Sequence, residues 1–196
     1  MRTYTGKEKK DSRADLIALY REMVAPRLPE GRQYWTLCNT QPKKNSELVQ
    51  LVDSGLITAS QFHGVDDEIK LIEQNRKWWP EAHFYCGDLF RCVLSADNFD
   101  PGLFFYDSTN TPAFDELYRN LAFIMSRCRT GTMVCANVML NDAHPPWKKY
   151  DEYLFLERLA DQLMSDWDNW KHGMQWGKYR QKGARANMAM YAFVSR

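Results

Sequence analysis

Hydrophobic positions along this chain alternate between a helical period and dense, strand-like runs. Residues 11–25 carry apolar side chains at three- and four-residue spacing until Pro26 ends the pattern. This spacing predicts an amphipathic helix with one apolar face. Residues 32–39 follow with a short run of aromatic and apolar side chains, which predicts a buried strand.

The rest of the chain continues this alternation. Strands are predicted at 60–66, 101–107 and 131–140, and residues 82–90 are predicted as a strand that runs into a turn at Gly87-Asp88. Helices are predicted at 46–55, 67–79, 111–128 and 150–170. Two final apolar segments, 172–181 and 186–196, flank a basic turn and predict an antiparallel hairpin. This order predicts an α/β fold with a doubly wound, mostly parallel sheet, helices on both faces and a C-terminal antiparallel hairpin.

Cap residues mark the ends of several predicted helices. Asn45 or Ser46 is predicted to cap the helix at 46–55, and Gly55 to end it. Asp67 and Glu68 are expected in the first turn of the helix at 67–79, where acidic side chains suit the helix dipole.

The composition is that of a globular protein. Of the 196 residues, 44% are hydrophobic and 26% charged, which excludes a disordered or fibrous chain. No apolar run approaches the ~20 residues that span a bilayer, and residues 1–13 lack the apolar stretch of a secretory signal. The five cysteines are an odd count without metal-ligand spacing, so we expect reduced thiols, a cytoplasmic location and no metal site.

Charge is unevenly distributed, although the net charge is only +1. Residues 1–44 carry ten basic and five acidic side chains, whereas residues 45–100 carry four basic and ten acidic ones. Residues 178–196 hold five basic side chains and no acidic one. Two interpretations stay open, a charge-mixed solvated surface and a basic rim that binds a polyanion.

Polar side chains stand where the predicted strands end, which is where open parallel sheets bind ligands. These residues are Cys38, Asn39 and Thr40 after the first strand, Asp66 and Asp67 after the second, Gly87, Asp88 and Leu89 after the third, Asp107 after the fourth, and Asn137 to Asn141 after the fifth. One acid at a strand end is usually a helix cap, but three at successive strand ends favour a ligand site. His63 and His83, inside predicted strands, are expected to be packed or edge residues.

Two of these acids suit a nucleoside. A carboxylate at Asp66 offers two oxygens to the vicinal hydroxyls of a ribose, and a carboxylate at Asp88 accepts from an exocyclic amine such as that of adenine. Together they describe a site for adenosine.

The segment FHGVDDEIKLIEQNRKWWPEAHFYCGDLF (62–90) resembles class I S-adenosylmethionine-dependent methyltransferases. In that family an acid ends the second strand and holds the ribose, and a Gly-Asp pair ends the third and meets the adenine amine. The resemblance implies S-adenosylmethionine as cofactor and a Rossmann-like, seven-stranded sheet whose last strand is antiparallel. In architecture the resemblance implies a methyltransferase-like domain over 31–196, and the apolar pattern of residues 11–25 predicts a helical segment over 1–30 before it.

The first strand departs from this family. The family carries a glycine-rich loop there, whereas this chain has no glycine between Gly31 and Gly55. Two alternatives follow: Asn39, Thr40 and the start of the next helix bind the cofactor differently, or the site has lost the cofactor.

The acceptor side is less defined. Asp107 is expected to orient a nucleophile or take its proton, with Asn110 and His144 in nearby loops. Lys182 and Arg185, in the hairpin turn, would favour an anionic acceptor such as nucleic acid. Asp107 is followed by Ser-Thr-Asn and not by the Pro-Pro-aromatic motif of the family's amino-methylating nucleic-acid branch.

Three functions therefore remain: a methyltransferase acting on an unidentified acceptor, a catalytically silent binding or scaffold module of the same fold, and an enzyme of this fold with another nucleoside ligand.

Overall fold

The computed structural model describes residues 7–38, 46–108, 113–141, 152–166, 170–173, 179–180 and 186–196. The chain divides into two compact units, residues 1–105 and residues 106–196. Within the described residues, no helix is both long and apolar enough to cross a bilayer.

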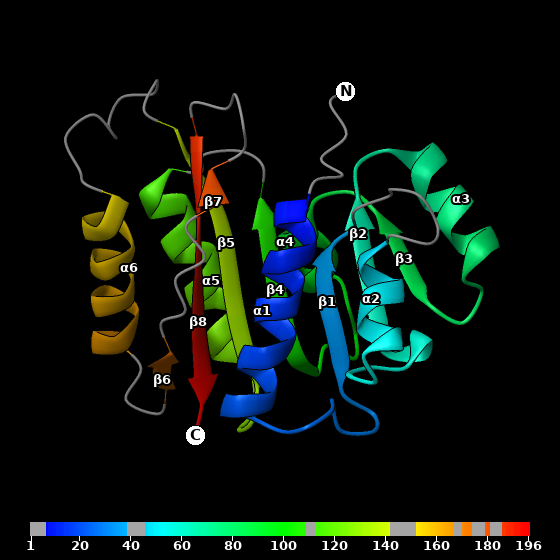
Figure 1. Ribbon diagram of the computed structural model, residues 1–196, viewed down its shortest axis with the longest axis horizontal. Coiled ribbons are helices and arrows are strands. Elements are labelled where there is room, and N and C mark those ends of the chain that lie inside the picture. The colour runs from blue at the N-terminus through cyan, green and yellow to red at the C-terminus, as the bar shows by residue number, and fades with distance from the viewer. Residues whose placement is uncertain are drawn as a thin grey trace. The chain divides into compact units, whose positions relative to one another are not determined.

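The first unit alternates helices and parallel strands (Figure 1). Its elements are α1 (Lys7–Met23), β1 (Gln33–Leu37), α2 (Glu47–Asp53), β2 (Phe62–Asp66), α3 (Ile69–Trp78), β3 (His83–Cys86), α4 (Leu89–Leu94) and the start of β4 (Pro101–Ser108). Strand β1 pairs in parallel with β2 and β4, and β2 pairs in parallel with β3. The parallel α/β order predicted from the sequence is therefore confirmed in this unit.

One face of these strands is covered by α1 and α2, which lie in front of them in Figure 1. Because side chains alternate along a strand, Tyr34 faces these helices while Trp35 faces the opposite side. The Tyr34 hydroxyl donates a hydrogen bond to Glu47 of α2, and Glu47 pairs with Arg13 of α1 at 3.3 Å between Nε and Oε2. Burial, followed by the Glu47 charge, raises the pKa of Tyr34 well above its usual value. This buried trio joins two helices to the first strand.

Cap residues of α2 agree with the sequence. The Ser46 hydroxyl accepts from the backbone N–H of Val49 at 3.3 Å, and Gly55 follows the helix with a φ of +73°, which L side chains rarely adopt. The acids before α3 lie outside its first turn, because the helix begins at Ile69 and Glu68 is its N-cap.

The second unit is built around an antiparallel strand. Its elements are α5 (Phe114–Arg127), β5 (Met133–Asn141), α6 (Glu152–Asp166), β6 (Trp170–Gly173), β7 (Tyr179–Arg180) and β8 (Ala186–Ser195). Strand β8 pairs antiparallel with β5, with β6 and with β7. The C-terminal hairpin expected from the sequence is thus confirmed, and β6 adds a further antiparallel pairing.

Two sequence-based expectations are wrong in part. The strand expected over 82–90, running into a turn at Gly87-Asp88, ends at Cys86 just before that turn. The residues after the turn form a helix that was not expected, α4, because Asp88 caps it and its apolar residues, Leu89, Phe90 and Val93, fall at helical spacing. The helix expected over 150–170 ends at Asp166, and Trp170 belongs to β6, where it is buried beside β8.

Because Arg13, Glu47 and Tyr34 are buried together, removing one of these side chains should destabilise the fold strongly. Glu47→Ala should lower the free energy of unfolding by about 3–5 kcal/mol, because the Arg13 charge then stays buried without its carboxylate. Urea denaturation measures the loss. Glu73→Ala, on the exposed side of α3, is the matched control and should change stability by less than about 0.5 kcal/mol. Equal stability of the two variants would contradict a structural role for Glu47.

Candidate functional site at the strand ends

The carboxyl ends of β1, β2 and β3 meet at one edge of the first unit. The backbone N–H of Cys38 donates to Val65 O at 2.6 Å, and that of Gly87 donates to Asp66 O at 2.9 Å. These two bonds continue the strand pairing beyond the strands. They bring together the residues that the sequence placed here: Cys38, Asp66, Asp67, Gly87, Asp88 and Leu89.

Asp66 ends β2 as a half-buried carboxylate. Its Oδ1 accepts the backbone N–H of Glu68 at 2.8 Å, which turns the chain toward α3. Burial raises the pKa of Asp66 above its usual value; the Glu68 N–H opposes this shift, and the nearby acids Asp67 and Glu68 add to it. Such a carboxylate can accept hydrogen bonds from neutral hydroxyl groups without a cationic partner.

The Gly87-Asp88 turn connects β3 to α4. Gly87 has a φ of +144°, so the backbone conformation itself favours glycine here. The exposed Asp88 carboxylate accepts from the backbone N–H of Arg91 at 2.9 Å and caps α4. Leu89 contributes packing, because its side chain is buried.

Cys38 directs its side chain toward the protein interior. Its Sγ accepts from Asn75 Nδ2 at 3.2 Å, and it lies against Gly64, where an added Cβ would come within 3.1 Å of the Cys38 Cβ. Burial, followed by the charges of Glu47 and Asp66, raises the pKa of the Cys38 thiol. The thiol is therefore protonated at neutral pH and is not a nucleophile.

Sequence reasoning missed Gly64 and Asn75. The signals were present: Gly64 interrupts an apolar strand, and Asn75 stands three residues after the buried Ile72 on the inner side of α3. A helix asparagine on an apolar face needs a partner, and here that partner is the Cys38 sulfur.

In the second unit, Asp107 meets a buried amide. The Nδ2 group of Asn137 donates to Asp107 Oδ1 at 2.7 Å. Asn137 is inside β5 and not at its end, because that strand continues to Asn141. Burial raises the pKa of the Cys135 thiol, and the negative charge of Asp107 raises it further.

Other predicted site residues fall outside the described part of the chain: Asn39, Thr40, Asn110, His144, Lys182 and Arg185. Among the residues that the structure describes, no group of three or more His, Cys, Asp or Glu side chains is arranged to hold a metal ion.

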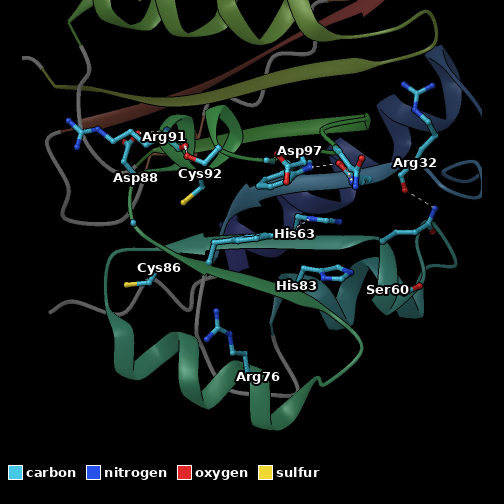
Figure 2. Close-up of a pocket in the computed structure, with 18 of the residues that line it drawn as sticks. Arg32, Ser60, His63, Arg76, His83, Cys86, Asp88, Arg91, Cys92 and Asp97 are labelled. Carbon is cyan, nitrogen blue, oxygen red and sulfur yellow. Dashed lines mark hydrogen bonds between the residues drawn. The ribbon is translucent and has the colours of Figure 1, made fainter.

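A hollow of about 990 Å³ adjoins the Gly87-Asp88 turn on the face of the first unit opposite α1 (Figure 2). Trp35, His63, His83 and Tyr85 line it from the strands, and Arg91 and Cys92 line it from α4. The hollow extends from Asp88 to Arg32 and Ser60 near the amino ends of β1 and β2.

Solved methyltransferase structures share this chain's fold. An O-methyltransferase from Bacillus cereus in complex with SAH has a TM-score of 0.61 at 9% identity, over 100% of this chain and 84% of that one. The N-methyltransferase NodS from Bradyrhizobium japonicum has a TM-score of 0.60 at 9% identity, over 97% and 98%. Trm5b from Pyrococcus abyssi has a TM-score of 0.57 at 12% identity over 98% of this chain, which spans 50% of its length.

No family model matches the sequence, and no curated protein matches it in sequence. The structural similarities nevertheless show that the chain has the class I methyltransferase fold, as the resemblance of residues 62–90 implied.

The raised pKa of Asp66 gives a pH-dependent prediction. A carboxyl group whose pKa is higher in the folded state stabilises the fold at low pH, and that contribution is lost as pH rises through the folded pKa. At pH 7 the Asp66→Asn variant should therefore unfold at a higher urea concentration than the parent protein. The advantage should disappear below about pH 4, where the unfolded carboxyl group is also protonated.

The exposed Asp97, outside the helices and strands, offers a matched control for the loss of one negative charge. Asp97→Asn should show no such gain at pH 7. If Asp66→Asn is less stable than the parent at pH 7, then Asp66 serves the fold as an ionised carboxylate and not as a group kept for a ligand.

Proposed function

We propose that this chain binds S-adenosylmethionine and transfers its methyl group to an acceptor. The observation that carries the proposal is the direct link between Asp66 and the Gly87-Asp88 turn. The Gly87 N–H donates to Asp66 O at 2.9 Å, so two acids of the kind an adenosine needs stand at adjacent parallel strand ends in a methyltransferase fold.

The residues fit the cofactor by their chemistry. We assign the Asp66 carboxylate to the ribose hydroxyls and the Asp88 carboxylate to the adenine amine, with Asp67, Gly87 and Leu89 as neighbours. Cys38 would contribute backbone groups, because its side chain packs on Asn75. Asn39 and Thr40 complete the proposed cofactor side. When bound, S-adenosylmethionine supplies an electrophilic sulfonium methyl group for in-line attack.

Asp107 is the residue that we assign to the acceptor. Its carboxylate is held by the Asn137 amide at 2.7 Å, which favours one orientation for accepting a proton from a nucleophile. Asn110, His144, Lys182 and Arg185 complete the proposed acceptor side, and the two basic residues support an anionic acceptor such as nucleic acid.

The proposal includes the finer architecture expected from the sequence. It comprises a doubly wound sheet with helices on both faces, a helical segment over 1–30, a domain over 31–196 and a cytoplasmic location. The seven strands that the resemblance implied are one too few, because the described residues already form eight, β1 to β8. The four parallel strands of the first unit and the antiparallel β8 of the second support this arrangement.

One observation favours a second candidate, the catalytically silent module. Asp66 and Asp88 both accept backbone N–H groups that turn the chain into a following helix, a role that needs no ligand. The strand-one loop also lacks the glycines with which the family approaches its cofactor. A scaffold protein of this fold would retain the same caps.

Binding of S-adenosylhomocysteine, the demethylated product, separates the two candidates. The parent chain should bind it in calorimetry, and Asp66→Ala should weaken binding roughly ten- to a hundredfold because hydrogen bonds to a charged group contribute ~1.5–3 kcal/mol. Asp88→Asn should weaken binding by about tenfold or less, because the amide keeps one acceptor oxygen.

Asp97→Ala is the matched control, since Asp97 is also an exposed acid near α4 but lies at no strand end. It should leave the affinity unchanged. A parent chain that binds neither S-adenosylmethionine nor its product contradicts the enzyme proposal and leaves the silent module.

A further inference from the structure

A ladder of stacked rings crosses the first unit on the face opposite α1. Trp35, His63 and His83 stand directly opposite one another in the register of β1, β2 and β3. The ring centroids of Trp35 and His63 lie 4.6 Å apart and those of His63 and His83 4.5 Å apart, with interplanar angles of 27° and 24°. Because parallel strands lie about 4.8 Å apart, in-register rings on one face stack like the steps of a ladder.

The inner steps of this ladder are fixed by hydrogen bonds and burial. Trp35 is 1% exposed, and its Nε1 donates to Gln33 Oε1 at 2.8 Å. His63 shares a hydrogen bond of 3.0 Å between its Nδ1 and the Tyr85 hydroxyl. Burial, followed by the neighbouring His83, lowers the pKa of His63 to about 3, so this ring is neutral at pH 7. The two inner rings of the ladder, Trp35 and His63, are therefore uncharged aromatic planes at neutral pH.

His83 is that last step, and it is exposed. Among the described residues β3 pairs only with β2, so the far side of His83 faces the open edge of the sheet. In Figure 2 His63 and His83 lie side by side in the hollow. A flat ring stacked on His83 would extend the ladder by one step and would shield an aromatic face from water.

A guanidinium stands at the same edge. Arg76 reaches from α3 to β3, where its Nη2 donates to Phe84 O at 2.6 Å, next to His83 in sequence, and it lines the hollow. A guanidinium has five N–H donors in a planar fork that suits phosphate oxygens, so this one bond does not exhaust it. The edge of β3 thus combines a stacking plane with a phosphate donor.

We propose that this edge binds a nucleotide, with the base stacked on His83 and the phosphate on Arg76. The ligand is either a free mononucleotide or one nucleotide of a single strand, which share this chemistry. The hollow of about 990 Å³ is at the upper end of the volumes that small-molecule sites occupy. This ligand is distinct from the proposed cofactor, and the inference does not rest on methyl transfer.

Strand geometry separates the two sites. His83 is the first residue of β3, whereas Gly87 and Asp88 follow its last residue. Four residues of strand span about 13 Å, at roughly 3.3 Å per residue. A base on His83 therefore lies at the amino end of β3, away from the adenine position assigned to Asp88.

Adenosine monophosphate is the probe for this site. We expect it to bind the full-length chain and to shift the imidazole resonances of His83, assigned in a ¹H–¹³C spectrum by comparison with His83→Phe. Adenosine, which lacks the phosphate, and ribose 5-phosphate, which lacks the ring, should each bind about tenfold more weakly or worse. A short single-stranded oligonucleotide that binds more tightly than the mononucleotide identifies nucleic acid as the source, and the reverse order identifies a free nucleotide.

Variants separate stacking from charge. His83→Ala should weaken binding of adenosine monophosphate about tenfold or more, and His83→Phe should restore it because it keeps a ring for stacking. Arg76→Ala should also weaken binding. Lys77→Ala, an exposed cation next to Arg76 in the last turn of α3, is the matched control and should bind like the parent chain.

Competition keeps this proposal separate from the proposed cofactor site. Saturating S-adenosylhomocysteine and the Asp66→Ala substitution should both leave binding of adenosine monophosphate intact. Displacement of the mononucleotide by S-adenosylhomocysteine would overturn the inference, as would unmoved His83 resonances at saturating mononucleotide, or an equal loss in Lys77→Ala and Arg76→Ala. Binding at His83 in a chain that ignores S-adenosylhomocysteine would support this inference while the methyltransferase proposal fails.

Discussion

The parallel register of β1, β2 and β3 is the constraint on which both sites of the first unit depend. At the carboxyl ends, this register places Asp66 beside the Gly87-Asp88 turn through the bond from Gly87 N–H to Asp66 O. Farther from the carboxyl ends, it stacks Trp35 in the middle of β1 on His63 and His83 near the amino ends of β2 and β3. Because side chains alternate from face to face, a slip of one residue would turn this aromatic ladder toward the helices. One set of backbone hydrogen bonds therefore positions both the acids at the carboxyl ends of β2 and β3 and the stacked aromatic rings.

The two faces of these strands are used differently. On one face, α1 and α2 are joined to β1 by the buried contacts among Arg13, Glu47 and Tyr34. On the other face, α4 is only six residues long, and the hollow remains above Trp35 and His63. The same helix begins at Asp88, so the residue that we assign to the adenine amine also sets where the hollow starts.

The sequence predicted what depends on local pattern. The apolar runs predicted the strands, and Ser46 and Gly55 predicted the ends of α2. The acids at positions 66 and 88 predicted that the carboxyl ends of β2 and β3 lie side by side. His63 and His83 were expected to be packed or edge residues, and they are buried and exposed respectively. Helix α4 was missed because its first two residues, Leu89 and Phe90, follow an apolar strand so closely that they were assigned to the strand, and the six-residue helix is little more than one and a half turns long.

What the sequence could not predict depends on distant pairings. The ring ladder unites residues from three strands that lie 28 and 20 positions apart in the chain, and its stacking follows from register. The contact between Asn75 and Cys38 likewise requires α3 to pack over the end of β1. The amide that binds Asp107 belongs to Asn137 in the middle of β5. The apolar pattern around Asn137 predicts a buried polar residue but not its partner. Hydrophobic periodicity predicts on which face of a helix or strand a side chain lies, but it does not predict which residue of the adjacent element that side chain contacts.

A crystal structure of the chain with S-adenosylhomocysteine tests the central claim most directly. The account predicts electron density at the carboxyl ends of β2 and β3, with both ribose hydroxyls within hydrogen-bond distance of the Asp66 carboxylate and the adenine amine facing Asp88. Density for the ligand at another position, or an empty edge at a saturating ligand concentration, would contradict the account and leave the acids at positions 66 and 88 as caps of the chain turns that follow their strands.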